Sequence, residues 1–309
     1  MSERAYLREV GLRDGLQLVR GDLSTAHKLQ WIREEAAAGV AEIEVTSFVP
    51  FKSFPIFADA AEVATAALQL PGLLASGLTP NARGALAAFA TGLRKVNYVI
   101  SASEAHSQAN VRRSTAEAMA DFARIVAARA EHGLEKTVTL SFGIATCFGC
   151  TIQGEVAEDL VYRIAEEGVA LGADEVMIAD TVGYAHPLQV ERIFAGVLAR
   201  LGQVPVAAHF HDTRGLGLAN IAAAARVGIR RFDASLGGLG GCPHAPGATG
   251  NVVFEDAAYL LETMGLSTGI DLPKLIALRR KVESWLPQER FSGAIARAGV
   301  PKNYHPAAA

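Results

Sequence analysis

In this 309-residue sequence, the segment His209-Phe210-His211 combines residue types and a spacing that suit metal binding. Side chains two positions apart on a strand point to the same face, so the two imidazoles lie on one side. Two neutral imidazoles and a carboxylate such as Asp14, with Asn251 beside them, form a ligand set that suits a divalent metal. The alternative is a pair of histidines that only make hydrogen bonds near a strand end.

Arg13 and Asp14 are adjacent and are followed by a glycine. Neighbours on a strand point to opposite faces, so both side chains can face one site only where the strand gives way to a loop, and Gly15 permits such a turn. Glu44 is the expected partner that orients a buried Arg13, because an unpaired inward carboxylate is costly. The alternative is a structural Arg13–Glu44 pair without a catalytic role.

Cys242 lies in the glycine-rich run Gly237-Gly-Leu-Gly-Gly-Cys-Pro243. So much glycine favours a mobile loop that closes over a site. A cysteine in such a loop can act as a general acid or base when its pKa is tuned. The alternative is a small buried apolar residue, which is the commonest environment of cysteine.

Other residues of types that can bind metals or cofactors are interpreted as structural. Cys147 and Cys150 have redox or zinc spacing, but no second pair exists, which favours structural thiols. The segment Gly215-Leu-Gly217 lacks the context of a dinucleotide fingerprint. Four histidines are expected to be solvent-facing or helix-capping, namely His27, His106, His132 and His186.

A recurring pattern predicts the elements that must position the chemical residues: a glycine, two residues, a charged residue, then alternating apolar positions. The pattern occurs at Gly39–Val45, Gly92–Tyr98, Gly172–Ile178 and Gly228–Ala234. In each case the glycine fits the left-handed position that ends a helix, and a strand follows. The helix before Gly39 is expected to take Ser24 or Thr25 as its N-cap.

Four further strands are expected, of which one opens the chain and three lie between these four. They lie at about Tyr6–Leu12, Leu73–Leu78, Val138–Ile144 and Val204–Phe210. Eight strands alternating with helices predict an α/β fold, a TIM (β/α)8 barrel with extra C-terminal helices, although the pattern alone also allows a doubly wound open sheet. We expect a single domain over residues 1–309, with the barrel at about 5–265 and a helical extension at about 266–304.

The residues singled out above follow the predicted strands, at the edge where TIM-barrel active sites lie. The same edge adds Ser47 after the second strand and Asp180-Thr181 after the sixth. This shared position is the strongest internal argument for one active site.

The overall composition narrows the class of protein. The net charge is −3 and the pI is near 6.3, so no global basic field indicates nucleic acid. The apolar stretches are shorter than the roughly 18 residues of a membrane helix, and the N-terminus has no signal core. We expect a cytoplasmic protein with free thiols that captures any acidic ligand through local basic groups or a metal.

The order and spacing of these motifs resemble the 3-hydroxy-3-methylglutaryl-CoA lyase family, within the metal-dependent barrel lyases and Claisen-type synthases. The matching segments run along nearly the whole chain: Glu9–Gln17, Ile43–Phe48, Ala179–Gly183, His209–Thr213, Leu218–Asn220, Gly238–Pro243 and Gly250–Asn251. The resemblance implies a retro-Claisen cleavage, assisted by Mg²⁺ or Mn²⁺, that yields acetyl-CoA and acetoacetate. It also implies an acyl-CoA substrate and a possible homodimer.

The resemblance also implies roles for individual residues. Asp14, His209, His211 and Asn251 would hold the metal. Arg13 would stabilise the enolate of the departing thioester, Glu44 would orient Arg13, and Cys242 would be the acid/base that protonates the departing carbon. Asp180 would belong to the inner or outer shell of the metal. Gln17, Ser47 and Thr181 would contact substrate.

The chain departs from the family pattern at several positions around the expected pocket. Leu12 stands where proline is common, Arg214 and Leu216 stand in the stretch after His211, and His244 replaces an aromatic residue. Arg214 could recruit another carboxylate or a CoA phosphate, and His244 could perturb the thiol. These changes leave open the alternative that the chain is a lyase for a related 3-hydroxy-3-carboxyalkyl acyl-CoA.

Two other functions compete with the lyase. A Claisen-type synthase would share the metal ligands, but Leu16 stands where that group has glutamate, and the Cys242 loop argues against it. A non-catalytic binding barrel is the least favoured, because a binder has no need of Cys242.

Overall fold

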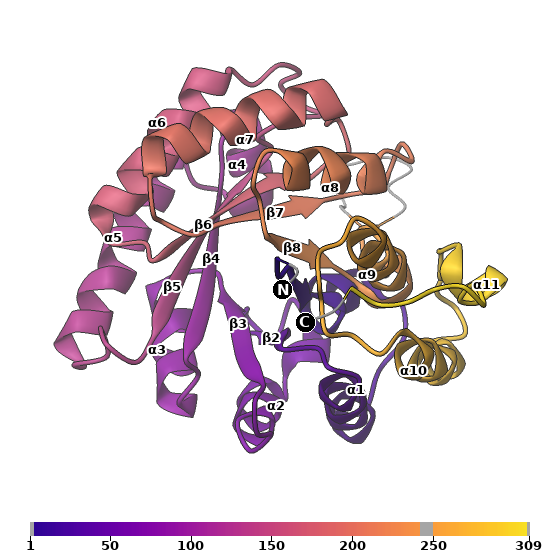
Figure 1. The fold of residues 1–309 in the computed structure, drawn as a ribbon. Coiled ribbons are helices and arrows are strands. Elements are labelled where there is room, and N and C mark those ends of the chain that lie inside the picture. The colour runs from indigo at the N-terminus through magenta and orange to yellow at the C-terminus, as the bar shows by residue number, and fades with distance from the viewer. Residues whose placement is uncertain (1–2, 242–249, 308–309) are drawn as a thin grey trace.

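The computed structural model describes residues 3–241 and 250–307, so Cys242 and His244 lie outside the described residues. Eight parallel strands close into a barrel, in which each strand pairs with the next and the last pairs with the first (Figure 1). The strands are β1 (Tyr6–Glu9), β2 (Glu42–Ser47), β3 (Leu74–Thr79), β4 (Lys95–Ser101), β5 (Thr139–Ala145), β6 (Glu175–Asp180), β7 (Val206–Phe210) and β8 (Arg231–Ala234). The closed barrel confirms the predicted TIM fold and excludes the open sheet.

Helices surround the barrel and bury its outer face (Figure 1). The helices that follow successive strands are α1 (Thr25–Ala37), α2 (Ala60–Ala67), α3 (Ala82–Thr91), α5 (Thr115–Glu131), α6 (Glu158–Leu171), α7 (Pro187–Leu201), α8 (Gly217–Arg226) and α9 (Phe254–Thr263). A short helix, α4 (Glu104–Val111), is inserted between β4 and α5. No helix of the described part of the chain is long and apolar enough to cross a membrane.

Two helices follow the barrel, α10 (Leu272–Trp285) and α11 (Ile295–Ala298). The Asp271 carboxylate caps α10 by accepting the N–H of Lys274 at 3.1 Å. Helix α10 packs against α1, where the rings of Trp285 and His27 stack with centroids 4.5 Å apart. The extra helices therefore cover the side of the barrel formed by its first and last units (Figure 1).

The local signals in the sequence end and begin helices where they were expected to. The four glycines of the recurring pattern, at positions 39, 92, 172 and 228, have φ values of 92, 87, 117 and 105°. Such left-handed backbone favours glycine. Of the two candidate N-caps of α1, Ser24 is the cap, and its Oγ accepts the N–H of His27 at 3.2 Å.

The first strand is shorter than predicted. It ends at Glu9 rather than Leu12, and the chain enters a single π-helical turn, η1 (Gly11–Gly15). The N–H groups of residues 13–15 all donate to the carbonyl of Val10, at 3.1, 2.7 and 3.2 Å. Single π-turns often occur at functional sites. This turn allows two consecutive side chains of η1 to face the barrel axis.

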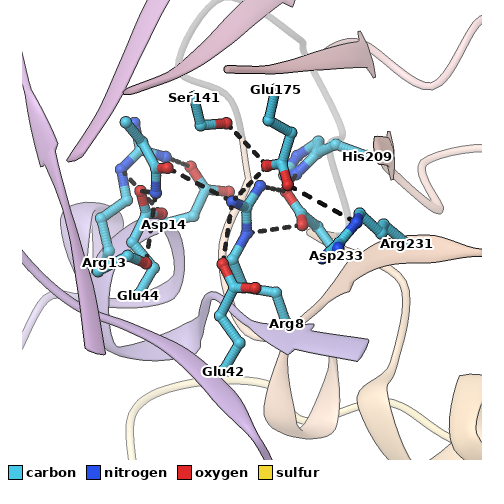
Figure 2. Close-up of polar contacts among 12 residues, drawn as sticks. Arg8, Arg13, Asp14, Glu42, Glu44, Ser141, Glu175, His209, Arg231 and Asp233 are labelled. Atoms are coloured by element: carbon cyan, nitrogen blue, oxygen red, sulfur yellow. Dashed lines mark hydrogen bonds and ion pairs between the residues drawn. The ribbon is translucent and has the colours of Figure 1, made fainter. Parts of the chain in front are cut away.

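The charged residue of the recurring pattern points into the barrel and forms a layer of ion pairs. Lys95 Nζ lies 2.7 Å from Glu42 Oε1 and 2.8 Å from Glu175 Oε1. Arg8 of β1 lies 3.5 Å from the same two carboxylates, and Arg231 lies 3.9 Å from Glu175 (Figure 2). Alternate strands of a TIM barrel supply the side chains of one layer, and here β2, β4, β6 and β8 do so with their first residues.

Candidate active site

A cavity of about 120 Å³ lies at the carboxyl end of the barrel, where the strands give way to loops. Its lining residues are Arg8, Arg13, Asp14, Gln17, Glu44, Leu78, Asn97, Val99, His106, Asn110, Ala145, Met177, Ala179, Thr181, His209, His211, Asp233 and Gly241. Polar residues predominate on the side formed by η1, β7 and β8. Apolar side chains from β3, β4, β5 and β6 form the other side.

Asp14, His209 and His211 come together in this cavity. Each offers one ligand atom, and these atoms lie within 4.8 Å of one another. Asp14 Oδ2 lies 3.7 Å from His211 Nε2. Asn251 joins them, because its backbone pairs with that of His211 and its Nδ2 donates to Asp14 Oδ2 at 2.7 Å. The structure thus brings together all four residues that the sequence suggested as metal ligands.

The donor set fits a divalent cation. Asn251 Nδ2 also lies 3.2 Å from the carbonyl of Leu239, whereas Asn251 Oδ1 is buried without a hydrogen-bond partner among the described residues. A buried amide oxygen without a donor is costly unless something else satisfies it. An amide oxygen, a carboxylate and two imidazoles are together ligands that divalent metals accept.

The electrostatics of Asp14 favour its anionic form. Burial alone would raise the pKa of this carboxyl group, but the adjacent Arg13 charge and the contact with His211 outweigh burial and hold the pKa well below its usual range. Asp14 is therefore a carboxylate at any pH at which the protein would act, as a metal ligand must be.

Two residues that were not predicted as site residues, Asp233 and Arg8, hold the ring of His209 in place. His209 Nδ1 lies 3.1 Å from Asp233 Oδ2, and Arg8 donates to both Asp233 oxygens at 2.8 Å (Figure 2). Burial raises and the Arg8 charge lowers the pKa of Asp233, to a net value of about 2. Burial likewise opposes the charged form of His209, but the Asp233 carboxylate more than compensates and raises the pKa of His209.

Arg13 and Glu44 also meet at the cavity. Arg13 Nη1 hydrogen-bonds to Asp14, and Arg13 Nε lies 3.7 Å from Glu44 Oε2 (Figure 2). Asn97, a third residue that sequence reasoning missed, donates to Glu44 Oε1 at 2.6 Å. Burial raises the pKa of Glu44 although Arg13, Arg8 and Asn97 oppose the shift. The Arg13 guanidinium therefore lies beside the candidate metal ligands. It contacts Glu44, which in turn accepts a hydrogen bond from Asn97.

The remaining predicted residues differ in their relation to the cavity. Gln17 and Thr181 line it, and Gly241, the residue before Cys242, also reaches it. Ser47 is fully buried and is not part of the lining. Asp180 is not part of the lining either, because its carboxylate accepts the N–H groups of Tyr184 and Ala185 at 2.8 and 3.0 Å and so holds the loop after β6.

His106 corrects one expectation. It was predicted to be solvent-facing or capping, but it is 2% exposed and lines the cavity. The hydroxyl of Ser103 caps α4 at the N–H of His106, and His106 Nδ1 lies 2.7 Å from Ser101 Oγ. Asn110 lies one turn further along α4 and also lines the cavity. The i, i+4 spacing of these two polar residues was the available signal.

Arg214 and the two cysteines near residue 150 are structural. Arg214 donates to the carbonyls of Val182 and Gly183 at 3.1 and 3.0 Å, and its guanidinium stacks over a tyrosine ring. Cys147 and Cys150 are both buried free thiols, as predicted. Burial raises the pKa of Cys147 to about 12, which makes it unreactive.

The fold and the cavity together define a TIM-barrel enzyme with a candidate metal centre at the carboxyl ends of its strands. A family model described as HMGL-like matches residues 4–282. The chain therefore belongs to the HMGL-like family and is a carbon–carbon lyase.

Relatives and solved structures support this membership. The hydroxymethylglutaryl-CoA lyase of Bacillus subtilis is 37% identical over 281 residues, which cover 91% of this chain and 93% of that protein. The (R)-citramalyl-CoA lyase of Chloroflexus aurantiacus is 40% identical over 285 residues, or 89% of each chain. The structure of an HMG-CoA lyase from Acinetobacter baumannii, in complex with coenzyme A and 3-methylmalate, has a TM-score of 0.91 and 40% identity and covers 98% of this chain and 97% of that one.

Proposed function

We propose that this lyase cleaves 3-hydroxy-3-methylglutaryl-CoA to acetyl-CoA and acetoacetate with the help of Mg²⁺ or Mn²⁺. The observation that carries the proposal is the grouping of Asp14, His209 and His211 beside Arg13 in one cavity. Relatives named as hydroxymethylglutaryl-CoA lyases over nine-tenths of the chain support the substrate.

Four residues would hold the metal: Asp14, His209, His211 and Asn251. When bound, the cation would polarise the hydroxyl and carboxylate oxygens of the substrate and so ease loss of the hydroxyl proton. The anionic state of Asp14 and the Asp233 contact of His209 prepare both groups for this role. The carboxylate and amide oxygens suit Mg²⁺ and Mn²⁺, and the family resemblance supports the same two metals.

Arg13 would stabilise the charge that develops as the carbon–carbon bond breaks. When the tertiary hydroxyl gives its proton to a water molecule, its oxygen forms the ketone of acetoacetate, and the electron pair of the C2–C3 bond passes to the thioester as an enolate. A guanidinium beside the enolate oxygen lowers the free energy of this state most when water is excluded. Glu44, held by Asn97, would keep Arg13 in position.

Cys242 would complete the reaction by protonating C2 of the enolate to give acetyl-CoA. The family resemblance supports this role, and so does Gly241, which precedes Cys242 and lines the cavity. Gln17 and Thr181 would contact substrate from the rim, and Asp180 would hold the loop after β6. A cytoplasmic homodimer is part of the same proposal, and light scattering of the purified protein tests the dimer.

The test is a turnover assay of protein stripped of metal and then supplied with Mg²⁺, Mn²⁺ or neither. We expect 3-hydroxy-3-methylglutaryl-CoA to give equal amounts of acetyl-CoA and acetoacetate only when metal is present. The absence of both products from folded, metal-loaded protein would reject the substrate. The His211→Ala variant is the matched control for contaminating activity.

A second candidate substrate is citramalyl-CoA, in which the carboxylate is attached directly to the hydroxyl-bearing carbon. The relative from Chloroflexus aurantiacus named for this activity is 40% identical. Acetyl-CoA formed together with pyruvate, and a higher kcat/KM than with 3-hydroxy-3-methylglutaryl-CoA, would favour this substrate.

A further inference from the structure

Glu9 joins the two turns that lead into the catalytic segments. It is the last residue of β1 and is fully buried. Its Oε1 accepts the N–H of Gly11 at 2.5 Å and the N–H of Leu236 at 3.1 Å. Gly11 begins η1, and Leu236 begins η4 (Leu236–Gly238), the turn after β8. One oxygen atom therefore fixes the start of both segments.

A second buried carboxyl group, that of Glu35, acts on Glu9. Glu35 of α1 is fully buried, and its Oε1 accepts the indole N–H of Trp31 at 2.7 Å. Oε2 of Glu9 and Oε2 of Glu35 are both buried without a donor among the described residues, and Glu9 is close enough to raise the pKa of Glu35. Carboxylate oxygens only accept, so a hydrogen bond between two carboxyl groups requires a proton on one of them.

The described residues that act most on Glu9 add negative charge and no cation. They are Glu35 and Glu255 of α9. Glu255 Oε2 accepts the N–H of Gly237 at 2.9 Å, and its Oε1 lies 3.3 Å from Arg279 of α10. Burial raises the pKa of Glu9 to about 8, that of Glu35 well above its ordinary value and that of Glu255 to about 7. Arg279 lowers the pKa of Glu255 without cancelling the effect of burial, and it is not among the groups that act most on Glu9 or Glu35.

We propose that Glu9 is a positioning residue of the lyase reaction, whose carboxyl group shares one proton with Glu35 and ties η1 to the turn after β8. Arg13 and Asp14 project from η1, and the chain continues from η4 to Gly241 and Cys242. The inference rests on the proposed function only for the activity readout. Ionisation of both groups would place two like charges in contact and separate α1 from the end of β1.

Substitutions distinguish the shared proton from simple packing. In Glu9→Gln, the amide oxygen still accepts from Gly11 and Leu236, and the amide NH₂ donates to Glu35 without a titratable proton. We expect Glu9→Gln to retain kcat and to keep its activity above pH 8, where the wild type loses activity. Glu9→Ala removes the acceptor, and we expect kcat to fall about 10- to 100-fold, as for groups that orient metal ligands.

The control is Glu262→Gln, which changes another buried glutamate, hydrogen-bonded to Thr268 far from the cavity. We expect this variant to change the thermal midpoint and leave the pH profile unchanged. The inference is wrong if the alkaline limbs of wild type and Glu9→Gln coincide, and equally wrong if Glu9→Ala folds and turns over at the wild-type rate.

A readout without substrate separates this inference from the proposed function. Infrared difference spectra at neutral pH should show the carbonyl stretch of a buried protonated carboxyl group in the wild type and in Glu262→Gln. The intensity of this band should fall in Glu9→Gln and in Glu35→Gln, and the part that Glu255 contributes should remain. Failure to cleave any acyl-CoA while the band behaves in this way would reject the substrate and keep the shared proton. A band of wild-type intensity in both variants would reject the shared proton.

Discussion

His209 and Asp233 are held together by a hydrogen bond of 3.1 Å, with Nδ1 of the imidazole as donor and Oδ2 of the carboxylate as acceptor. This contact sets the tautomer, because a proton on Nδ1 leaves Nε2 unprotonated and able to bind a cation. Arg8 fixes the carboxylate through two hydrogen bonds of 2.8 Å. The orientation of a candidate metal ligand on β7 thus depends on residues of β8 and β1.

The first prediction concerns this support. Asp233→Asn should lower the affinity for Mn²⁺ about 10- to 100-fold, because the neutral amide holds the Nδ1 proton of His209 more weakly than the carboxylate and can also turn its NH₂ toward the ring. Isothermal titration calorimetry of metal-free protein measures the change. Asp256→Asn is the control, since Asp256 is a buried aspartate that accepts the N–H groups of Ala294 and Ile295 and does not belong to the grouping of Asp14, His209 and His211. Equal metal affinity of the wild type and Asp233→Asn would contradict the prediction.

The second prediction concerns the carboxylate ligand. Asp14→Ala should abolish tight divalent-metal binding, because it removes the only carboxylate from the grouping with His209 and His211. Titration with Mn²⁺, followed by electron paramagnetic resonance of the free ion, measures the loss. Unchanged affinity would remove Asp14 from the ligand set. A circular dichroism spectrum like that of the wild type shows that the barrel remains folded.

The third prediction is a pH dependence of metal binding. A metal binds the neutral imidazole, and the Asp233 carboxylate raises the pKa of His209 against the effect of burial. Metal affinity should therefore weaken as the pH falls through this raised pKa, at a higher pH than for a histidine of ordinary pKa near 6.5. In Asp233→Asn the acid loss of affinity should move to lower pH. An acid limb at the same pH in both proteins would show that His209 does not control it.

The fourth prediction tests the acid/base role proposed for Cys242. Cys242→Ala should lower kcat about 10²- to 10⁴-fold, the usual contribution of a positioned acid or base, and leave metal and acyl-CoA affinity nearly unchanged. Steady-state kinetics and calorimetry measure the two effects separately. Cys147→Ala is the control thiol, because burial makes Cys147 unreactive. Wild-type turnover in Cys242→Ala would reject the assignment.

The fifth prediction concerns the ion-pair layer. Lys95→Met should lower the free energy of unfolding by about 3–5 kcal/mol, because it leaves Glu42 and Glu175 without their closest cation. The exposed pair of Lys281 and Glu34 is the comparison, and Lys281→Met should cost at most about 1 kcal/mol. Urea denaturation of both variants measures the difference. Similar costs would mean that the layer contributes no more than a surface ion pair.

The parts of this structure that were predictable from sequence depend on local rules. Glycine at a left-handed helix end, the cap at Ser24 and the apolar strands are set by neighbours a few residues apart. The four candidate metal ligands were predictable because strand ends in a barrel converge on one edge, wherever they lie in the sequence.

The features that sequence reasoning missed depend on contacts between distant segments. The length of β1 was overestimated because Val10 looks like another strand residue until its carbonyl starts η1. His106 was misjudged because its burial depends on where α4 lies over the cavity. Asp233 and Asn97 had no local signal beyond a polar residue within a strand.

The ion-pair layer has a consequence for how the barrel assembles. The first four strands supply Arg8, Glu42 and Lys95 to the interior, and the last four supply Glu175, Arg231 and Asp233. Three ion pairs join the two halves, because Arg8 lies 2.8 Å from Asp233 and 3.5 Å from Glu175, and Lys95 lies 2.8 Å from Glu175. A half-barrel cannot exclude water from its interior without leaving the charges of these pairs unpaired. Closing the ring and neutralising its interior are one event, so the chain acquires a dry interior only as a whole.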